Sequence, residues 1–271
     1  MLERTIIEIA PKTWLISEYK LVNMYLLEGA DTALLIDCGA GIGNIRETVF
    51  ALTKKPLTVV ITHGHYDHDG GAMLFPAVYM HRDDLAYAAK MCEEMGTEGR
   101  RAYAISRGTV RNPATSAQEI ASMVIPNGPV NRLPLADNCI FNLGGRTIEV
   151  IPTPGHSKGS VVLLDRENRL LFTGDMANDC LLLNFAGSST SVTEYNKSMR
   201  KLWARESEYD FICIGHDALD KTDKTIIQDY IHATDKLICG EAAGTPGANA
   251  LHSGTGYQEG LVLIWYNPNY L

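Results

Sequence analysis

Short apolar runs rich in β-branched residues alternate along the chain with longer amphipathic and charged stretches. The clearest apolar run is 57–62, which directly follows Pro56 and is typical of a buried strand. Similar runs fill the chain up to Asp37, return over 133–175, and end with 261–266. Strands separated by helical stretches in this way predict an α/β fold.

The stretches between these runs carry apolar residues at helical spacing. They predict helices at about 43–54, 193–205 and 223–239. The charged stretch 82–125 has few strand signals and predicts a helical insertion. Glycine recurs over 240–260, which predicts a long loop that acts as a lid or binding loop near the site. We expect residues 1–271 to form a single domain that contains both features.

A dense group of polar residues follows the strand 57–62. It consists of His63, His65, Asp67 and His68. Imidazole and carboxylate are common metal ligands, and crowding them costs free energy unless a cation compensates. We predict that Asp69 caps a following helix, which puts the group in a strand-to-helix loop, where α/β sheets often bind ligands. A solvated polar loop is the alternative interpretation.

Three further apolar runs end in a glycine that precedes one metal-competent side chain. The pairs are Gly155-His156, Gly174-Asp175 and Gly215-His216. Glycine permits a tight turn that brings the backbone close to a bound group. One such histidine is weak evidence, but three such ends beside the dense group favour a metal site. Five histidines and two aspartates fit two ions better than one, because a catalytic zinc takes about three protein ligands.

These residues resemble the metallo-β-lactamase fold superfamily. The first four match its HxHxDH motif, and His156, Asp175 and His216 match its three later ligands in order. Residues 23–27 and 33–39 resemble its first hairpin and its strand ending in aspartate, and 155–160 resembles its GHTxGS segment. The resemblance covers most of residues 5–216 and implies a four-layer αββα sandwich.

The resemblance also implies a division of the ligands between two divalent metal ions. His63, His65 and His156 would hold the first ion; Asp67, His68 and His216 would hold the second; Asp175 would bridge them. Zinc is expected for a histidine-rich set without cysteine, with iron or manganese as alternatives. Asp67 would also act in catalysis, by orienting the nucleophile and shuttling a proton.

The implied activity is that of a metal-dependent hydrolase. A hydroxide shared by two cations would attack an ester-like bond of a small molecule, namely a thioester, a lactone or a phosphoester. No lysine or arginine follows Lys236, which argues against a glutathione thioester. Two other classes stay open: a mononuclear iron oxidoreductase of the persulfide dioxygenase type, and a non-catalytic metal-binding protein.

Four more residues are candidates for contacts around the metals. Asp37 ends a strand and would hydrogen-bond a ligand histidine. Tyr66 would face solvent or substrate. For Lys158 and His252 we favour exposure to solvent over a position in the site. The insertion also contains four arginines, at positions 100, 101, 107 and 111. We favour a solvated helix face paired with nearby glutamates over a recognition patch for phosphate or carboxylate.

Composition limits the partners and the location. The net charge of −8 disfavours nucleic acid, which needs a basic surface. No apolar run approaches the roughly 20 residues that span a membrane, and no signal peptide is evident at the start. The six cysteines are scattered, which predicts buried thiols rather than disulfides. We therefore expect a cytoplasmic protein with a small-molecule substrate and no membrane partner.

Overall fold

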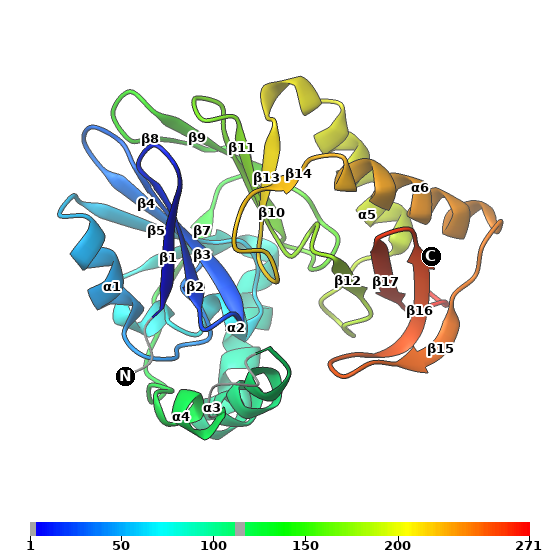
Figure 1. Cartoon of the computed structure of the whole chain (residues 1–271), viewed down its shortest axis with the longest axis horizontal. Helices are drawn as coiled ribbons and strands as arrows, with labels where there is room; N and C mark the ends of the chain where they lie inside the picture. The colour runs from blue at the N-terminus through cyan, green and yellow to red at the C-terminus, as the bar shows by residue number, and fades with distance from the viewer. Residues whose placement is uncertain (1–3, 112–116) are drawn as a thin grey trace.

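A computed structural model describes residues 4–111 and 117–271 and contains two large β-sheets (Figure 1). The first sheet has seven strands in sequence order: β1 (Thr5–Ala10), β2 (Thr13–Glu18), β3 (Val22–Glu28), β4 (Ala33–Ile36), β5 (Leu57–Ile61), β6 (Val78–His81) and β7 (Arg132–Leu135). Strands β1 to β4 are antiparallel, and β4 to β7 are parallel. The parallel strands β4 and β5 therefore end at the same edge, where Asp37 and His63 follow them.

The second sheet has six strands. Their order is β14 (Thr222–Asp223), β13 (Phe211–Ile214), β11 (Leu170–Gly174), β10 (Val161–Asp165), β9 (Thr147–Pro152) and β8 (Ile140–Asn142). Strand β10 is antiparallel to both β9 and β11, and β11 is parallel to β13. The carboxyl ends of β9, β11 and β13 therefore lie at one edge of the sheet, which brings together the three segments that carry single ligand-type residues.

Helices flank the sheets. They are α1 (Ile45–Leu52), α2 (Tyr66–Asp69), α3 (Arg82–Arg111), α4 (Ala117–Ser122), α5 (Val192–Trp203) and α6 (Ile226–Cys239), with short 3₁₀ turns at Ala72–Leu74 and Glu206–Glu208. A buried core joins the facing sides of the two sheets and includes Leu34, Val60 and Phe172. A second core lies between the first sheet and α1, and a third joins the second sheet to α5 and α6. This α/β arrangement of two main sheets with flanking helices confirms the predicted fold class.

Two local predictions were wrong. Asp69 is the last residue of α2 rather than the cap of a following helix; it is buried and pairs with Arg132. The glycine-rich stretch is not a long loop. Strands β15 (Thr245–Ala248) and β16 (Ser253–Glu259) form a hairpin, which joins β17 (Val262–Tyr266) and β12 (Cys180–Leu183) in a third, four-stranded sheet. Glycine lowers strand propensity, but pairing with β17 supplies the hydrogen bonds that hold the stretch extended.

The helical insertion is present where the sequence predicts it. Helix α3 bends at Gly96, which has a positive φ of 54°, and it packs against α4 over a small core that includes Tyr103 and Ile120. Residues 112–116 of the predicted insertion, like residues 1–3 at the start of the chain, lie outside the described residues. Within the described part of the chain, no helix combines the length and apolar character needed to cross a bilayer.

Candidate metal centre and pocket

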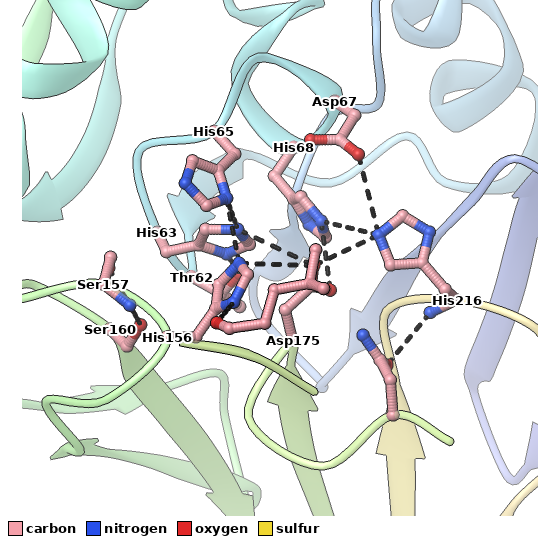
Figure 2. Close-up of polar contacts among 12 residues, drawn as sticks. Thr62, His63, His65, Asp67, His68, His156, Ser157, Ser160, Asp175 and His216 are labelled. Carbon is pink, nitrogen blue, oxygen red and sulfur yellow. Dashed lines mark hydrogen bonds and ion pairs between the residues drawn. The ribbon is translucent and has the colours of Figure 1, made fainter. Parts of the chain in front are cut away.

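Seven ligand-type side chains meet at the strand ends of the two sheets (Figure 2). They are His63, His65, Asp67, His68, His156, Asp175 and His216. The first four follow β5 directly, and His156, Asp175 and His216 follow β9, β11 and β13. All seven occupy buried or nearly buried positions. The seven residues predicted to bind metal therefore lie in one cluster.

Three imidazoles converge on one side of the cluster. Nδ1 of His65 lies 3.1 Å from Nε2 of His63 and 2.9 Å from Nε2 of His156. Nδ1 of His156 donates a hydrogen bond to the carbonyl oxygen of Leu182 (2.9 Å), so its Nε2 carries a lone pair when the ring is neutral. Converging lone pairs repel one another, and a cation between them would remove that repulsion.

A second group faces the first across Asp175. Nε2 of His216 lies 3.3 Å from Nε2 of His68 and 3.6 Å from Oδ2 of Asp67. Nδ1 of His216 donates to the carbonyl oxygen of Leu21 (2.6 Å). This hydrogen bond orients the ring with its other nitrogen toward the cluster, as outer partners do for metal-bound histidines.

Asp175 lies between the two groups. Its Oδ2 is 3.5 Å from Nε2 of His156 and 3.2 Å from Nε2 of His216, and its Oδ1 is 3.2 Å from Nε2 of His68. Oδ1 is buried, its contact with His68 does not have hydrogen-bond geometry, and no other described residue donates to it. A buried carboxylate oxygen without a donor is costly unless a cation compensates it. The donor set of imidazoles and carboxylates therefore fits divalent metal ions, with Asp175 within reach of both groups.

The electrostatics of the cluster agree with this interpretation. Burial and neighbouring imidazoles lower the pKa of His63 well below its ordinary value, and burial with His156 lowers that of His65 to about 3. Burial also lowers the pKa of His68, but Asp175 and Asp37 raise it above the ordinary value. His63 and His65 are thus neutral, whereas the carboxylates around His68 favour a positive charge there. A bound metal cation would supply that positive charge in place of a proton.

Asp37 lies directly behind the cluster. Its Oδ2 accepts hydrogen bonds from Nδ1 of His68 (2.8 Å) and from Oγ1 of Thr62 (2.9 Å), and its Oδ1 accepts from the backbone of Thr62 (2.7 Å). Asp37 has a φ of 61°, a left-handed conformation that is uncommon for a residue other than glycine. These contacts give Asp37 the position expected from the sequence, against the outer nitrogen of a ligand-type histidine.

Two of the glycines before these residues are required by close contacts. A Cβ at Gly174, where φ is 49°, would lie 2.6 Å from Oγ1 of Thr62. A Cβ at Gly215 would lie 2.3 Å from Oδ1 of Asp175 and 3.0 Å from Cε1 of His68. Any side chain here would displace the cluster, which explains the strand-Gly-ligand pattern in the sequence.

A cavity of about 210 Å³ opens above the cluster. Its floor includes His65, Asp67, His156, Asp175 and His216. Its walls combine Tyr66, Met91, Leu182 and Phe185 with Arg107 and Arg111 from α3 and Leu251 and His252 from the hairpin turn between β15 and β16. Chain segments far apart in the sequence thus build a wall that is partly apolar and partly cationic.

The structure corrects two predictions about this wall. His252 is half-buried and lines the cavity, whereas we favoured an exposed loop histidine. The insertion arginines do not form one solvated face. Arg101 pairs with a nearby glutamate, Glu98, whereas Arg100 is buried and donates to the carbonyl oxygens of three residues, Ala40, Gly70 and Ile125. Helix packing, which a local pattern does not contain, separates these four side chains.

The remaining candidates divide between the cavity and the surface. Tyr66 lines the cavity and packs edge-on against Tyr103, with ring centroids 4.9 Å apart. Lys158 is exposed and does not line this cavity. All six cysteines are free, but only Cys38 and Cys213 are buried, so the prediction of buried thiols holds for part of the set.

Sequence reasoning missed two residues that support the cluster. Asp84 is buried in α3 and accepts hydrogen bonds from the backbone of Gly64 (2.8 Å), the backbone of Gly159 (2.8 Å) and Oγ of Ser157 (2.5 Å), so it ties together the two loops that carry His63 and His156. Tyr103, also in α3, donates to Oδ2 of Asp67 (3.0 Å). Both lie far from their partners in the sequence, and no local motif marks them.

The imidazoles and carboxylates at these strand ends form the donor set of a divalent metal site. The family model described as Metallo-beta-lactamase superfamily matches residues 19–216, well over half of the chain. The chain therefore belongs to the metallo-β-lactamase superfamily, as the HxHxDH motif indicated.

Individual relatives extend the comparison. An acyl-coenzyme A thioesterase MBLAC2 from Gallus gallus is 29% identical over 189 residues, which cover 66% of this chain and 66% of the relative, just under two thirds of either. Among solved structures, a metallo-beta-lactamase from Pontibacter korlensis aligns with a TM-score of 0.62 at 18% identity, covering 86% of this chain and 99% of that one. The sec-alkylsulfatase Pisa1 from Pseudomonas sp. aligns with a TM-score of 0.64 at 17% identity, covering 90% and 46%. At these identities the solved structures show the fold alone.

Proposed function

We propose that the protein hydrolyses thioesters of small molecules with the help of two divalent metal ions, zinc being the expected metal. The observation that carries the proposal is the cavity, which places a cluster of imidazoles and carboxylates beneath a wall of apolar and cationic side chains. The 29% identity to an acyl-coenzyme A thioesterase supports a thioester among the ester-like bonds. A thioester hydrolase adds water across the C–S bond and releases a carboxylic acid and a thiol.

Two groups of ligands are proposed for the two ions. His63, His65 and His156 would hold one, and Asp67, His68 and His216 would hold the other. Asp175 would bridge them, because its Oδ2 lies 3.5 Å from Nε2 of His156 in the first group and 3.2 Å from Nε2 of His216 in the second. Bound divalent cations lower the pKa of water and polarise a carbonyl oxygen.

The residues around the ions have separate tasks. Burial raises the pKa of Asp67, but the opposing effect of His68 and His216 is larger in sum, so the net pKa lies below the ordinary value. Asp67 is therefore ionised at neutral pH. Its carboxylate would orient the attacking water and accept a proton from it, while Tyr103 holds Oδ2 in place. Asp37 would keep the His68 ring in the orientation that binds metal. Phe185 and Leu182 would exclude bulk water from the reacting bond.

The test combines metal analysis with a substrate panel. Protein purified without added metal should contain close to two metal ions per chain, and it should hydrolyse acyl thioesters at least about tenfold faster than lactones, phosphodiesters and β-lactams of similar size. Dialysis against a chelator should abolish hydrolysis, and adding zinc should restore it.

Other results would favour the competing classes. A single iron per chain with oxygen-dependent turnover would replace the proposal with a mononuclear oxidoreductase. Full metal occupancy without turnover of any of the four substrate classes would indicate a non-catalytic metal-binding protein. Faster hydrolysis of lactones or phosphodiesters would keep the hydrolase and reject the thioester.

A further inference from the structure

Helix α3 places three residues of one face at the cavity. Tyr103, Arg107 and Arg111 are spaced by four residues, so they share one side of the helix. Tyr103 reaches the cluster through its hydrogen bond to Asp67, and both arginines line the cavity. The insertion is therefore part of the site. The charge partners of its two arginines indicate which groups of a substrate they can bind.

The two arginines differ in their partners. Arg111 forms an ion pair with Asp217, the residue after His216. Arg107 has no carboxylate partner among the described residues; its guanidinium carbon lies 5.5 Å from the centre of the Tyr103 ring. Arg111 is thus neutralised within the protein, whereas no described carboxylate neutralises Arg107.

The other titratable groups of the cavity do not neutralise Arg107. The carboxylates of Asp67 and Asp175 face the imidazoles of the cluster, and Asp217 faces Arg111. His252 lines the same cavity; burial and Arg107 lower its pKa to about 4, so it is neutral at physiological pH. In Figure 1 the turn between β15 and β16, which carries His252, extends toward the side of the molecule where α3 lies.

We propose that Arg107 binds an anionic group of the substrate, a carboxylate or a phosphate, close to the bond that is cleaved. This inference rests on the proposed function and narrows it to thioesters that carry a negative charge. A guanidinium offers two parallel N–H donors that match either anion, and its contact with the face of the Tyr103 ring helps to hold it at the cavity.

The size of the cavity limits how far that anionic group lies from the reacting bond. Arg107 and the cluster line the same 210 Å³, room for roughly seven water-sized groups. Pockets that enclose a whole drug-sized ligand are larger, about 300–1,000 Å³. The cavity therefore accepts the reacting end of a substrate, and the anion must lie within that end, on either the acyl or the thiol part.

Two pairs of thioesters test whether the negative charge lies on the acyl part or on the thiol part of the substrate. The acyl pair is the succinyl and the neutral succinamoyl thioester of N-acetylcysteamine; the thiol pair is the butyryl thioester of 3-mercaptopropionate and that of 3-mercaptopropionamide. In each pair a carboxylate replaces an amide of nearly the same shape. The wild-type enzyme should have the lower KM for the anionic member of one pair, and that pair identifies the part that carries the charge.

Three variants assign the preference to Arg107. Arg107→Met should remove it, through a rise of about 10- to 100-fold in KM for the anionic member with little change for the neutral one. Arg107→Lys should keep part of it. The control is Arg101→Met, which alters an arginine of the same helix that pairs with Glu98 away from the cavity, and which should keep the wild-type preference. Thermal melts establish that all three variants are folded.

A binding measurement separates failure of this inference from failure of the proposed function. Calorimetry with the same four compounds, with CH₂ in place of sulfur, reports affinity without hydrolysis. Tighter binding of an anionic member that disappears in Arg107→Met supports the anion site even if no thioester is cleaved. Equal affinity and equal KM within both pairs, or an unchanged preference in Arg107→Met, would overturn the inference and leave thioester hydrolysis intact.

Discussion

The floor and the wall of the cavity are built in opposite ways. The floor consists of imidazoles and carboxylates on strand ends, and the outer nitrogens of the histidines are held by partners such as Asp37 and the carbonyl oxygens of Leu21 and Leu182. Part of the wall comes from the insertion and from the hairpin, whose Arg107 and His252 are half-buried. The chemical step needs the fixed geometry that the hydrogen-bonded side chains of the floor provide. The more exposed side chains of the wall are placed to contact the substrate. The difference suggests that substrates can change by altering the wall while the floor is kept.

One hydrogen bond joins the two regions. Tyr103 belongs to the insertion, yet it donates to Asp67, whose side chain forms part of the floor. Asp84, at the start of the same helix, ties the two ligand-bearing loops together from behind. The insertion thus supports the floor as well as forming the wall, and variants at different depths should separate these contributions.

The largest expected effect comes from the floor itself. Asp175→Asn keeps the shape of the side chain but removes the negative charge that faces both groups of imidazoles. We expect at least one metal ion to be lost and hydrolysis to fall by about 10³-fold or more, by analogy with the loss of other strong electrostatic contributions. Elemental analysis and kcat measure the two effects. Near-normal metal content with near-normal activity would show that Asp175 does not bridge the ions.

The next effect concerns the support behind the floor. Asp84→Ala leaves two buried backbone N–H groups and a serine hydroxyl without their acceptor, which should cost about 3–5 kcal/mol of unfolding free energy. Urea unfolding measures this loss. Asp83→Asn is the matched control, because Asp83 is the neighbouring residue and its side chain is 56% exposed. Equal stability of the two variants would contradict the anchoring role of Asp84.

A smaller effect should follow from cutting the link between wall and floor. Tyr103→Phe removes the hydroxyl that donates to Asp67, and we expect kcat to fall by about tenfold, the typical worth of a hydrogen bond to a charged group. Tyr66→Phe is the control, since Tyr66 packs on the same ring but its hydroxyl forms no hydrogen bond with residues 4–111 or 117–271. If both variants lose the same activity, packing rather than the hydrogen bond to Asp67 is responsible.

The smallest effect is expected far from the cavity. Glu208 pairs with Arg166 and Arg205, and hydrogen bonding to Arg205 lowers its pKa from 4.5 to about 2. A lowered folded-state pKa stabilises the protein above the unfolded value, and the contribution is lost as the pH falls from about 4.5 toward 2. Because the side chain is 29% exposed, Glu208→Gln should cost less than about 1 kcal/mol at pH 7.

Urea unfolding of wild type and Glu208→Gln at several pH values tests this prediction. The difference in stability should shrink below pH 4.5, and kcat at pH 7 should be unchanged. A loss of activity would mean that the surface network reaches the cavity, and the contrast between floor, wall and surface would then fail.

How much of the site the sequence predicts depends on how local each signal is. His63 to His68 form one short motif, and His156, Asp175 and His216 each follow a strand and a glycine, so all seven candidate ligands are readable. Asp37 could be named because it ends a strand. Tyr103 and Asp84 could not, because their partners lie 36 residues away in one case and up to 75 in the other.

The sequence by itself determined the α/β class, the candidate ligands and the position of the insertion, because these depend on hydrophobic periodicity and on short motifs. Only the tertiary structure decided that the glycine-rich stretch is a hairpin, that Arg101 faces solvent while Arg107 faces the cavity, and that His252 lies in the wall. Those outcomes depend on strand pairing and helix packing between distant segments. Their free energy comes from contacts that no single stretch of the sequence contains.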